Sequence, residues 1–411
     1  MKRKKIKARY RNFLSLGILF LLMACVESYD FKSEGTASVI IVQGFVSDEF
    51  KRHEISLSNS YDLESDENSF ITNAAVSVIA SDGAQYDYFH TENGVYKSYD
   101  EFQAEAGKTY QLEILHEGVT YLSEEEKIYG RSEIGEVEAS LRVNNAGIEG
   151  IAITTERSSN EDQVQFFRYD YSETYKIVAP YSSGYKLVVD PDGQNASLVE
   201  APDERRVCYN TEESIESVLK TTKFREDQTE FEDVIRFLPV NDLKIRYRYS
   251  ILLKQYLISP DAYNFYETLK ELSGSQNAFS QNQPGFITGN IKAVNSNNKV
   301  LGYFEVASAD EKRIFVDPLE FFNVTDFPGF DQYCSLVWPG VPMRPNSPDP
   351  LVGYIESGEY QYVGDRNSPY AAMIDLPPDT PVGPYILANI SCVDCRTLGT
   401  NVQPEFWIED E

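Results

Sequence analysis

Cysteine is the residue type with the clearest chemistry in this 411-residue chain, and the first of its five copies stands apart. A cluster of basic residues and then an apolar run, Phe13 to Ala24, precede Cys25, which is the arrangement of a secretory signal. The letters Leu22-Met23-Ala24-Cys25 match a bacterial lipobox, although Met23 fills a position where Ala, Ser or Thr is commoner. We therefore expect cleavage before Cys25, which becomes the mature N-terminus and carries an N-acyl/diacylglycerol lipid.

This signal predicts a cleaved leader over residues 1–24 and a lipidated tether over residues 25–35. Several acyl chains on one cysteine give firm anchoring, because each buried CH₂ contributes about 0.8 kcal/mol. The acidic residues just after Cys25 resemble the export signals that place lipoproteins on the outer face of the outer membrane, so a lipid-anchored, outward-facing location is predicted. Two alternatives stay open: an ordinary secreted protein with an incidental Cys25, and an uncleaved anchor helix.

The other four cysteines are Cys208, Cys334, Cys392 and Cys395. In an oxidising compartment this even number permits up to two disulfides, with three pairings. The last two form a C-x-x-C, which is also found in redox-active and zinc sites. However, the sequence that follows is loop-like, and neither a second C-x-x-C nor a later histidine supplies further zinc ligands. Structural disulfides are the favoured interpretation; a metal site, redox chemistry and free thiols remain alternatives.

Calcium is a weaker candidate. Asp190, Asp192 and Asn195 place oxygen ligands around a glycine. The same residue types are what a hairpin turn requires, so the turn is the favoured interpretation and no metal site is predicted.

Aromatic residues form a second weak signal. The run from Val164 to Val178 contains three tyrosines at alternating positions, Tyr169, Tyr171 and Tyr175. Tyrosine is enriched at binding surfaces, which makes these three candidate binding residues. At strand spacing one face of such a run more often belongs to a core, with tyrosines at its rim.

Catalytic motifs are missing from the sequence. It contains no G-x-S-x-G, H-E-x-x-H, P-loop or G-x-G-x-x-G pattern. The chain has three histidines, His53, His90 and His116, and its many acidic residues offer no distinctive carboxylate pair. We therefore expect a protein that is not an enzyme and that carries no cofactor apart from the acyl lipid.

Charge excludes one class of partner. The chain has 65 acidic and 37 basic residues and a formal net charge of −28 at pH 7. The leader holds seven of the basic residues and no acidic one, so the mature body carries −35. Such a body has no general basic surface for nucleic acid, and anionic head groups repel it. We expect no nucleic-acid partner, and membrane attachment only through the lipid on Cys25.

The elements that position these residues are mainly β. Residues 36–130 contain seven short alternating segments separated by turns, which is typical of an immunoglobulin-like or transthyretin-like β-sandwich. Residues 131–411 predict a larger β-rich domain. From Pro328 onward the chain is rich in proline and glycine, which indicates a loop or extended C-terminal region.

One short helix is predicted in the second domain, over about residues 260–273. Ser259 is a favourable N-cap, Pro260 suits the first turn, and Gly274 ends the pattern. The residues expected on its apolar face are Tyr263, Tyr266, Leu269 and Leu272.

Several longer strings resemble a known family. They include SVIIVQGFV from Ser38, the block from Arg248 to Lys270, QPGFITGNIKAV from Gln283, and CVDCR from Cys392. Together with the lipobox they resemble a Bacteroidota-type outer-membrane lipoprotein family of unknown function, DUF4249-like, whose members are often encoded beside TonB-dependent receptors. The resemblance implies no catalytic residues.

The function implied by the resemblance is that of an accessory lipoprotein. It would work with a TonB-dependent receptor, or another outer-membrane barrel complex, in nutrient uptake or outer-membrane assembly. One alternative is a stand-alone surface lipoprotein that binds glycans or peptides; a hydrolase with an inconspicuous carboxylate pair is a further one.

Overall fold

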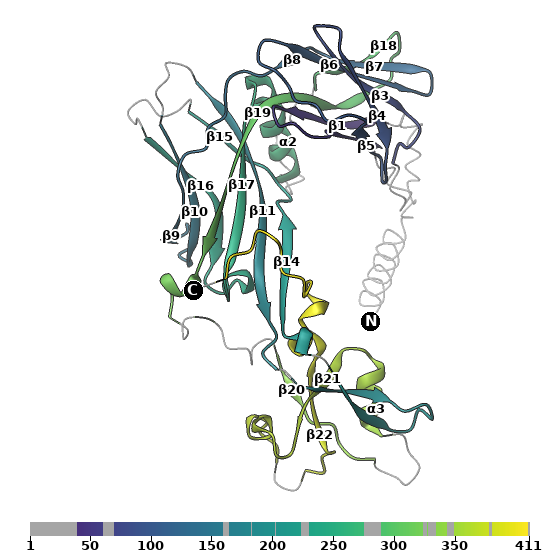
Figure 1. The fold of residues 1–411 in the computed structure, drawn as a ribbon, viewed down its shortest axis with the longest axis vertical. Coiled ribbons are helices and arrows are strands. Elements are labelled where there is room, and N and C mark those ends of the chain that lie inside the picture. The colour runs from purple at the N-terminus through teal and green to yellow at the C-terminus, as the bar shows by residue number, and fades with distance from the viewer. Residues whose placement is uncertain are drawn as a thin grey trace, which may run out of the picture.

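The computed structural model places three β-rich modules one after another along its long axis (Figure 1). Cys25, the leader and the tether lie outside the residues that it describes. Those residues are 39–60, 70–158, 164–181, 183–201, 203–222, 230–274, 289–323, 327, 334–342, 349–377 and 380–409. The mainly β, sandwich-type fold is confirmed.

The first sandwich is built largely from consecutive antiparallel strands in the order β1-β2-β5-β4-β3-β6-β7, with β8 paired to β6. In β1 to β7 alternate side chains enter a shared apolar core, since successive residues of a strand point to opposite faces. Their bounds are β1 Ile40–Ser47, β2 Glu54–Asn59, β3 Ala75–Ala80, β4 Gln85–His90, β5 Val95–Ser98, β6 Thr109–His116, β7 Val119–Ser123 and β8 Glu126–Lys127.

Two strands from much later in the chain complete this sandwich. β18 (Ile291–Val294) pairs with β7, and the first half of β19 (Val300–Val316) runs parallel to β1. Phe304, from β19, is fully buried in the core of the first sandwich. The sequence-based limits of 36–130 therefore leave out two of its strands, because an alternating pattern identifies a strand but not its partner.

The middle sandwich begins where the first one ends, on the same strand. The second half of β19 pairs with β17, and the sheet continues through β11 to β14, with β15 also on β11. A three-stranded sheet, β16-β10-β9, packs against it over a second apolar core. The bounds are β9 Val137–Val143, β10 Glu149–Ser158, β11 Phe166–Val178, β14 Val207–Glu213, β15 Val218–Thr221, β16 Glu230–Pro239 and β17 Tyr249–Leu257.

Helix α2 (Pro260–Gly274) confirms the predicted helix. Ser259 caps it, since the Ser259 hydroxyl accepts a hydrogen bond from the amide of Ala262 at 3.0 Å. Two of the four residues expected on its buried face, Tyr263 and Tyr266, pack with Ala262 and Phe265 against β19, whereas Leu269 is 39% exposed. The packed residues belong to the first two turns, where the helix meets the sheet.

The third module shows that the expectation of a loop-like C-terminal region was wrong for much of its described part. A sheet in the order β20-β22-β21 packs with the β12–β13 hairpin and with helix α3. The bounds are β12 Tyr185–Val189, β13 Ala196–Glu200, β20 Leu336–Val337, α3 Pro350–Glu356, β21 Tyr360–Asp365 and β22 Tyr385–Asn389. The overlooked signal was local: Asp349 caps α3 and accepts from the amide of Leu351 at 2.9 Å, with Pro350 in the first turn.

Short 3₁₀ helices occupy several connections. They are η1 Asp203–Arg205, η2 Leu243–Ile245, η3 Pro318–Glu320, η6 Pro369–Met373, η7 Ile390–Cys392 and η8 Cys395–Thr397. Within the ranges that the structure covers, no helix is both long and apolar enough to cross a membrane.

Candidate functional site

The four later cysteines form two disulfides, Cys208–Cys395 and Cys334–Cys392. The two cysteines of the C-x-x-C are therefore bonded to distant partners and not to each other. The first bridge joins β14 of the middle sandwich to η8, and the second joins the start of the third module to η7. This pairing resolves the alternatives that the sequence left open in favour of structural disulfides.

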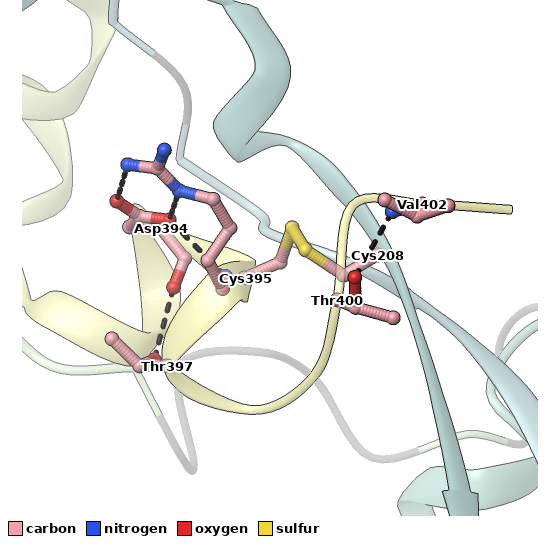
Figure 2. Close-up of a disulfide and its surroundings, with 7 residues drawn as sticks. Cys208, Asp394, Cys395, Thr397, Thr400 and Val402 are labelled. Carbon is pink, nitrogen blue, oxygen red and sulfur yellow. Dashed lines mark hydrogen bonds and ion pairs between the residues drawn. A yellow bond between two sulfur atoms is a disulfide. The ribbon is translucent and has the colours of Figure 1, made fainter.

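Local hydrogen bonds fix the loop around Cys395 (Figure 2). Asp394 caps η8, accepting from the amide of Arg396 at 3.1 Å and from its guanidinium at 2.7 Å. Burial raises the pKa of Asp394, but the hydrogen bonds from Arg396 outweigh it and leave that pKa below its ordinary value. Thr397 donates to the carbonyl of Asp394 at 2.9 Å, so the chain next to the bridge is held on both sides.

A cleft of about 460 Å³ lies between the end of the middle sheet and these disulfides. We call it the disulfide cleft. Its walls come from the C-terminal end of β11, from the residues after η2 and from the cysteine-containing loops. They include Tyr175, Val178, Tyr247, Cys334, Cys392 and Leu398.

The three tyrosines of the aromatic run have different surroundings. Tyr169 is fully buried and donates to Gln255 Oε1 at 2.7 Å, and Tyr171 packs against the middle core. Tyr175 lines the disulfide cleft, and its hydroxyl donates to Glu212 at 2.6 Å. Burial, and then this hydrogen bond to a carboxylate, raise the pKa of Tyr175 to about 12. Of the three candidates, the structure therefore brings Tyr175 to the cleft.

An ionic network around the buried Glu173 supports Tyr175, and sequence reasoning missed it. Glu173 on β11 accepts from Tyr249 Oη at 2.9 Å and from Arg236 Nε at 3.1 Å, and it also binds Lys244. Lys244 in turn binds Glu212 at 2.7 Å. The available signal was spacing: Glu173 has the same parity as the flanking tyrosines, which places its side chain on their face of the strand.

The network keeps the carboxyl group of Glu212 ionised. The hydrogen bond from Lys244, and then that from Tyr175, hold the pKa of Glu212 below its ordinary value. Glu212 is therefore an ionised acceptor that orients the Tyr175 ring at the wall of the cleft. Such an arrangement can present a fixed aromatic surface to a bound ligand or protein segment.

The calcium candidates form the turn between β12 and β13. The amide of Asp190 donates to the carbonyl of Asn195 at 2.9 Å, and Asp192 Oδ1 accepts from the amide of Gln194 at 3.0 Å. Gly193 has a φ of +68°, a conformation that glycine adopts without strain. Across the described ranges, no three His, Cys, Asp or Glu side chains come together in a group that could hold a metal ion.

A family model described as Domain of unknown function (DUF4249) matches residues 26–313. The match spans the first sandwich and most of the middle one, and it ends inside β19. It begins directly after Cys25. No curated protein matches the chain.

Proposed function

The chain belongs to the family described as Domain of unknown function (DUF4249), and from this premise we propose that it is a non-enzymatic lipoprotein of the outer membrane. Acyl chains on Cys25 anchor it with the body facing the cell exterior. There it acts as the accessory partner of a TonB-dependent receptor in nutrient uptake or outer-membrane assembly.

The residue at which the family match begins is the main support for the proposed lipid anchor. The family match opens at Val26, the residue that follows the predicted acylation site, and the predicted leader lies outside the matched range. The two disulfides support export as well, because such bonds persist in oxidising compartments.

The anchor, the acidic charge of the body and the disulfide cleft support the partner role. A lipid and a tether of about ten residues hold a protein at high effective concentration near membrane partners. The acidic body is repelled by anionic lipid, which keeps it free to face a barrel. The disulfide cleft, with its fixed Tyr175, offers a contact surface at the end of the middle sandwich.

Palmitate labelling in cells tests the anchor. We expect Cys25→Ala to abolish the label and to release the protein from the membrane fraction. The matched control, Cys208→Ala with Cys395→Ala, removes two other cysteines and leaves labelling unchanged. Labelling that survives Cys25→Ala contradicts the anchor, whatever the folded state of the body.

Co-purification from detergent extracts tests the partner, and protease treatment of intact cells tests the orientation. We expect an outer-membrane receptor to be recovered with the wild-type protein, and the body to be cleaved from outside. Abundant folded protein that recovers no receptor contradicts the accessory role. Direct ligand binding by that receptor-free protein favours the alternative, a stand-alone surface binding lipoprotein, for which the disulfide cleft is the supporting observation.

A further inference from the structure

Strand β9 forms an open edge of the middle sandwich. In the sheet β16-β10-β9 it pairs with β10 on one side, and no strand among the described residues pairs with its other side. Figure 1 shows this sheet at one margin of the middle sandwich. The edge strand β14 differs, because Thr400 covers it: the amide of Thr400 donates to the carbonyl of Tyr209 at 2.9 Å. An open edge such as that of β9 can accept a further strand.

The backbone groups of β9 point alternately to β10 and to the open side. At the turn that joins the two strands, the amide of Asn144 donates to the carbonyl of Ile148 at 2.9 Å. Since hydrogen-bonded residues alternate along an antiparallel pair, the even-numbered residues of β9 bond to β10. The N–H and C=O groups of Ala139 and Leu141 therefore point to the open side, where another strand would meet them.

The side chains of β9 leave this edge unprotected. Val137 is buried in the middle core, and Ala139 packs against that core. Leu141 and Val143 lie on the same face of the strand, yet they are 45% and 63% exposed. The strand contains no lysine or proline, and its pairing with β10 has no β-bulge, which are the devices that commonly protect an edge. Exposed apolar side chains on an open edge indicate that another strand pairs there.

The sequence of β9, VEASLRV, is complementary to its own reverse. On either side of Ser140 stand two apolar residues, Ala139 and Leu141, and beyond them two residues of opposite charge, Glu138 and Arg142. If two β9 strands pair antiparallel with Ser140 at the centre, each Ala139 lies opposite a Leu141. The backbone groups that point to the open side then bond to each other.

The same register places each Glu138 opposite an Arg142 of the other strand. Opposite charges at directly facing positions stabilise a strand pair, whereas like charges destabilise it. Arg142 Nε donates to Ser140 Oγ at 3.1 Å, and a guanidinium has five N–H donors, so it can bind a carboxylate as well. A strand from a different protein would not need this match of charges, which is why a second copy of the chain is the favoured occupant.

We propose that two copies of this chain pair through β9, antiparallel about a two-fold axis at Ser140. The contact joins the β16-β10-β9 sheets of both copies into one continuous sheet and covers each Leu141 with an Ala139. Because both copies use the same residues, the contact closes on itself and gives a dimer, not a fibre. The proposal does not rest on the receptor partnership, since it concerns this chain alone.

Cross-linking of single-cysteine variants tests the register in the full-length, detergent-solubilised protein. Ser140→Cys places two thiols across the axis, at the Cα separation of roughly 4.5 Å that a non-hydrogen-bonded pair has and a disulfide permits. We expect a dimer band on a non-reducing gel that a reductant removes. Glu138→Cys is the matched control, because this register separates its two thiols by four residues, or roughly 13 Å. A dimer band no stronger for Ser140→Cys than for Glu138→Cys overturns the proposal.

Charge reversal tests the contact without a new cysteine and protects the test against misfolding. Sedimentation of the wild type should give a dimer Kd of about 100 µM or tighter, as expected for a small interface. Glu138→Arg sets arginine against arginine and should weaken the dimer at least tenfold. Adding Arg142→Glu restores opposite charges and should return the Kd to within about threefold of the wild type.

Three results of the sedimentation experiment overturn the proposal. They are a wild type that stays monomeric, a Glu138→Arg variant that dimerises like the wild type, and a doubly reversed variant that stays as weak as the single one. Circular dichroism shows that the variants are folded. Receptor co-purification is a separate readout, so either proposal can fail alone.

Discussion

The two ends of the molecule are stabilised in different ways. The first sandwich has one large apolar core, drawn from strands of both early and late sequence, and residues 36–130 contain no cysteine. The third module has short strands and two small apolar clusters, one of which contains the Cys334–Cys392 disulfide, while Cys208–Cys395 ties its last loops to β14. A module that buries little apolar area has little stability from its core. A disulfide supplies part of the missing free energy of unfolding, because it restricts the conformations of the unfolded chain.

Removing a core side chain near one end gives the largest expected effect. Phe304→Ala leaves a cavity in the first sandwich and destabilises it by about 3–5 kcal/mol. Urea unfolding combined with hydrogen exchange is the measurement, and protection is expected to fall in β1 to β7.

Phe50→Ala is the control for this change, since Phe50 is 67% exposed and its loss should alter stability by no more than about 0.5 kcal/mol. If Phe304→Ala lowers protection in the middle sandwich and leaves β1 to β7 protected, the assignment of this half of β19 to the first core is wrong.

Removing a disulfide should affect the other end. Cys334→Ser with Cys392→Ser opens a link across 58 residues and is expected to lower stability by about 2–5 kcal/mol. Hydrogen exchange should increase in β20 to β22 and stay unchanged in β1 to β7. Treatment of the wild type with a reductant is the matched comparison. Equal loss of protection at both ends would refute the contrast between them.

Acid should act on the first sandwich through His53. Burial lowers the pKa of His53 to about 4, with the hydrogen bond to the carbonyl of Phe102, at 2.9 Å, acting in the other direction. The folded state therefore binds a proton at His53 less readily than the unfolded chain does. The contribution of neutral His53 to the free energy of unfolding is complete above about pH 6.5 and is lost as the pH falls toward 4.

The expected loss of unfolding free energy through His53 is about 2 kcal/mol between pH 7 and pH 4.5. It is measured as the difference between the wild type and His53→Gln, in which the side chain no longer titrates. An identical pH dependence of the wild type and His53→Gln would show that His53 does not make this end acid-sensitive.

Local sequence signals predicted many of the individual elements. The two-residue alternation marked the strands of the first sandwich, and Ser259, Pro260 and Gly274 marked the limits of α2. The residues from Asp190 to Asn195 marked a turn. Each of these depends on contacts between residues close in sequence, so the residue types carry the information directly.

The candidate site was accessible from sequence only in part. Tyrosine content drew attention to β11, and the even number of cysteines after Cys25 indicated disulfides. Which tyrosine reaches the disulfide cleft depends on where β11 ends against the third module. Which cysteines pair depends on how loops far apart in sequence meet, as Cys208 and Cys395 do across 187 residues.

The amino-acid sequence alone indicated the β-rich class, the helix and the acidic charge, and it predicts a lipobox that ends at Cys25. How β19 is shared and which cysteines bond became clear only from the packing of the whole chain. The physical reason is that alternation gives a strand two faces but no partner. One strand of 17 residues can therefore serve two cores, and only the packing of the complete chain selects that arrangement.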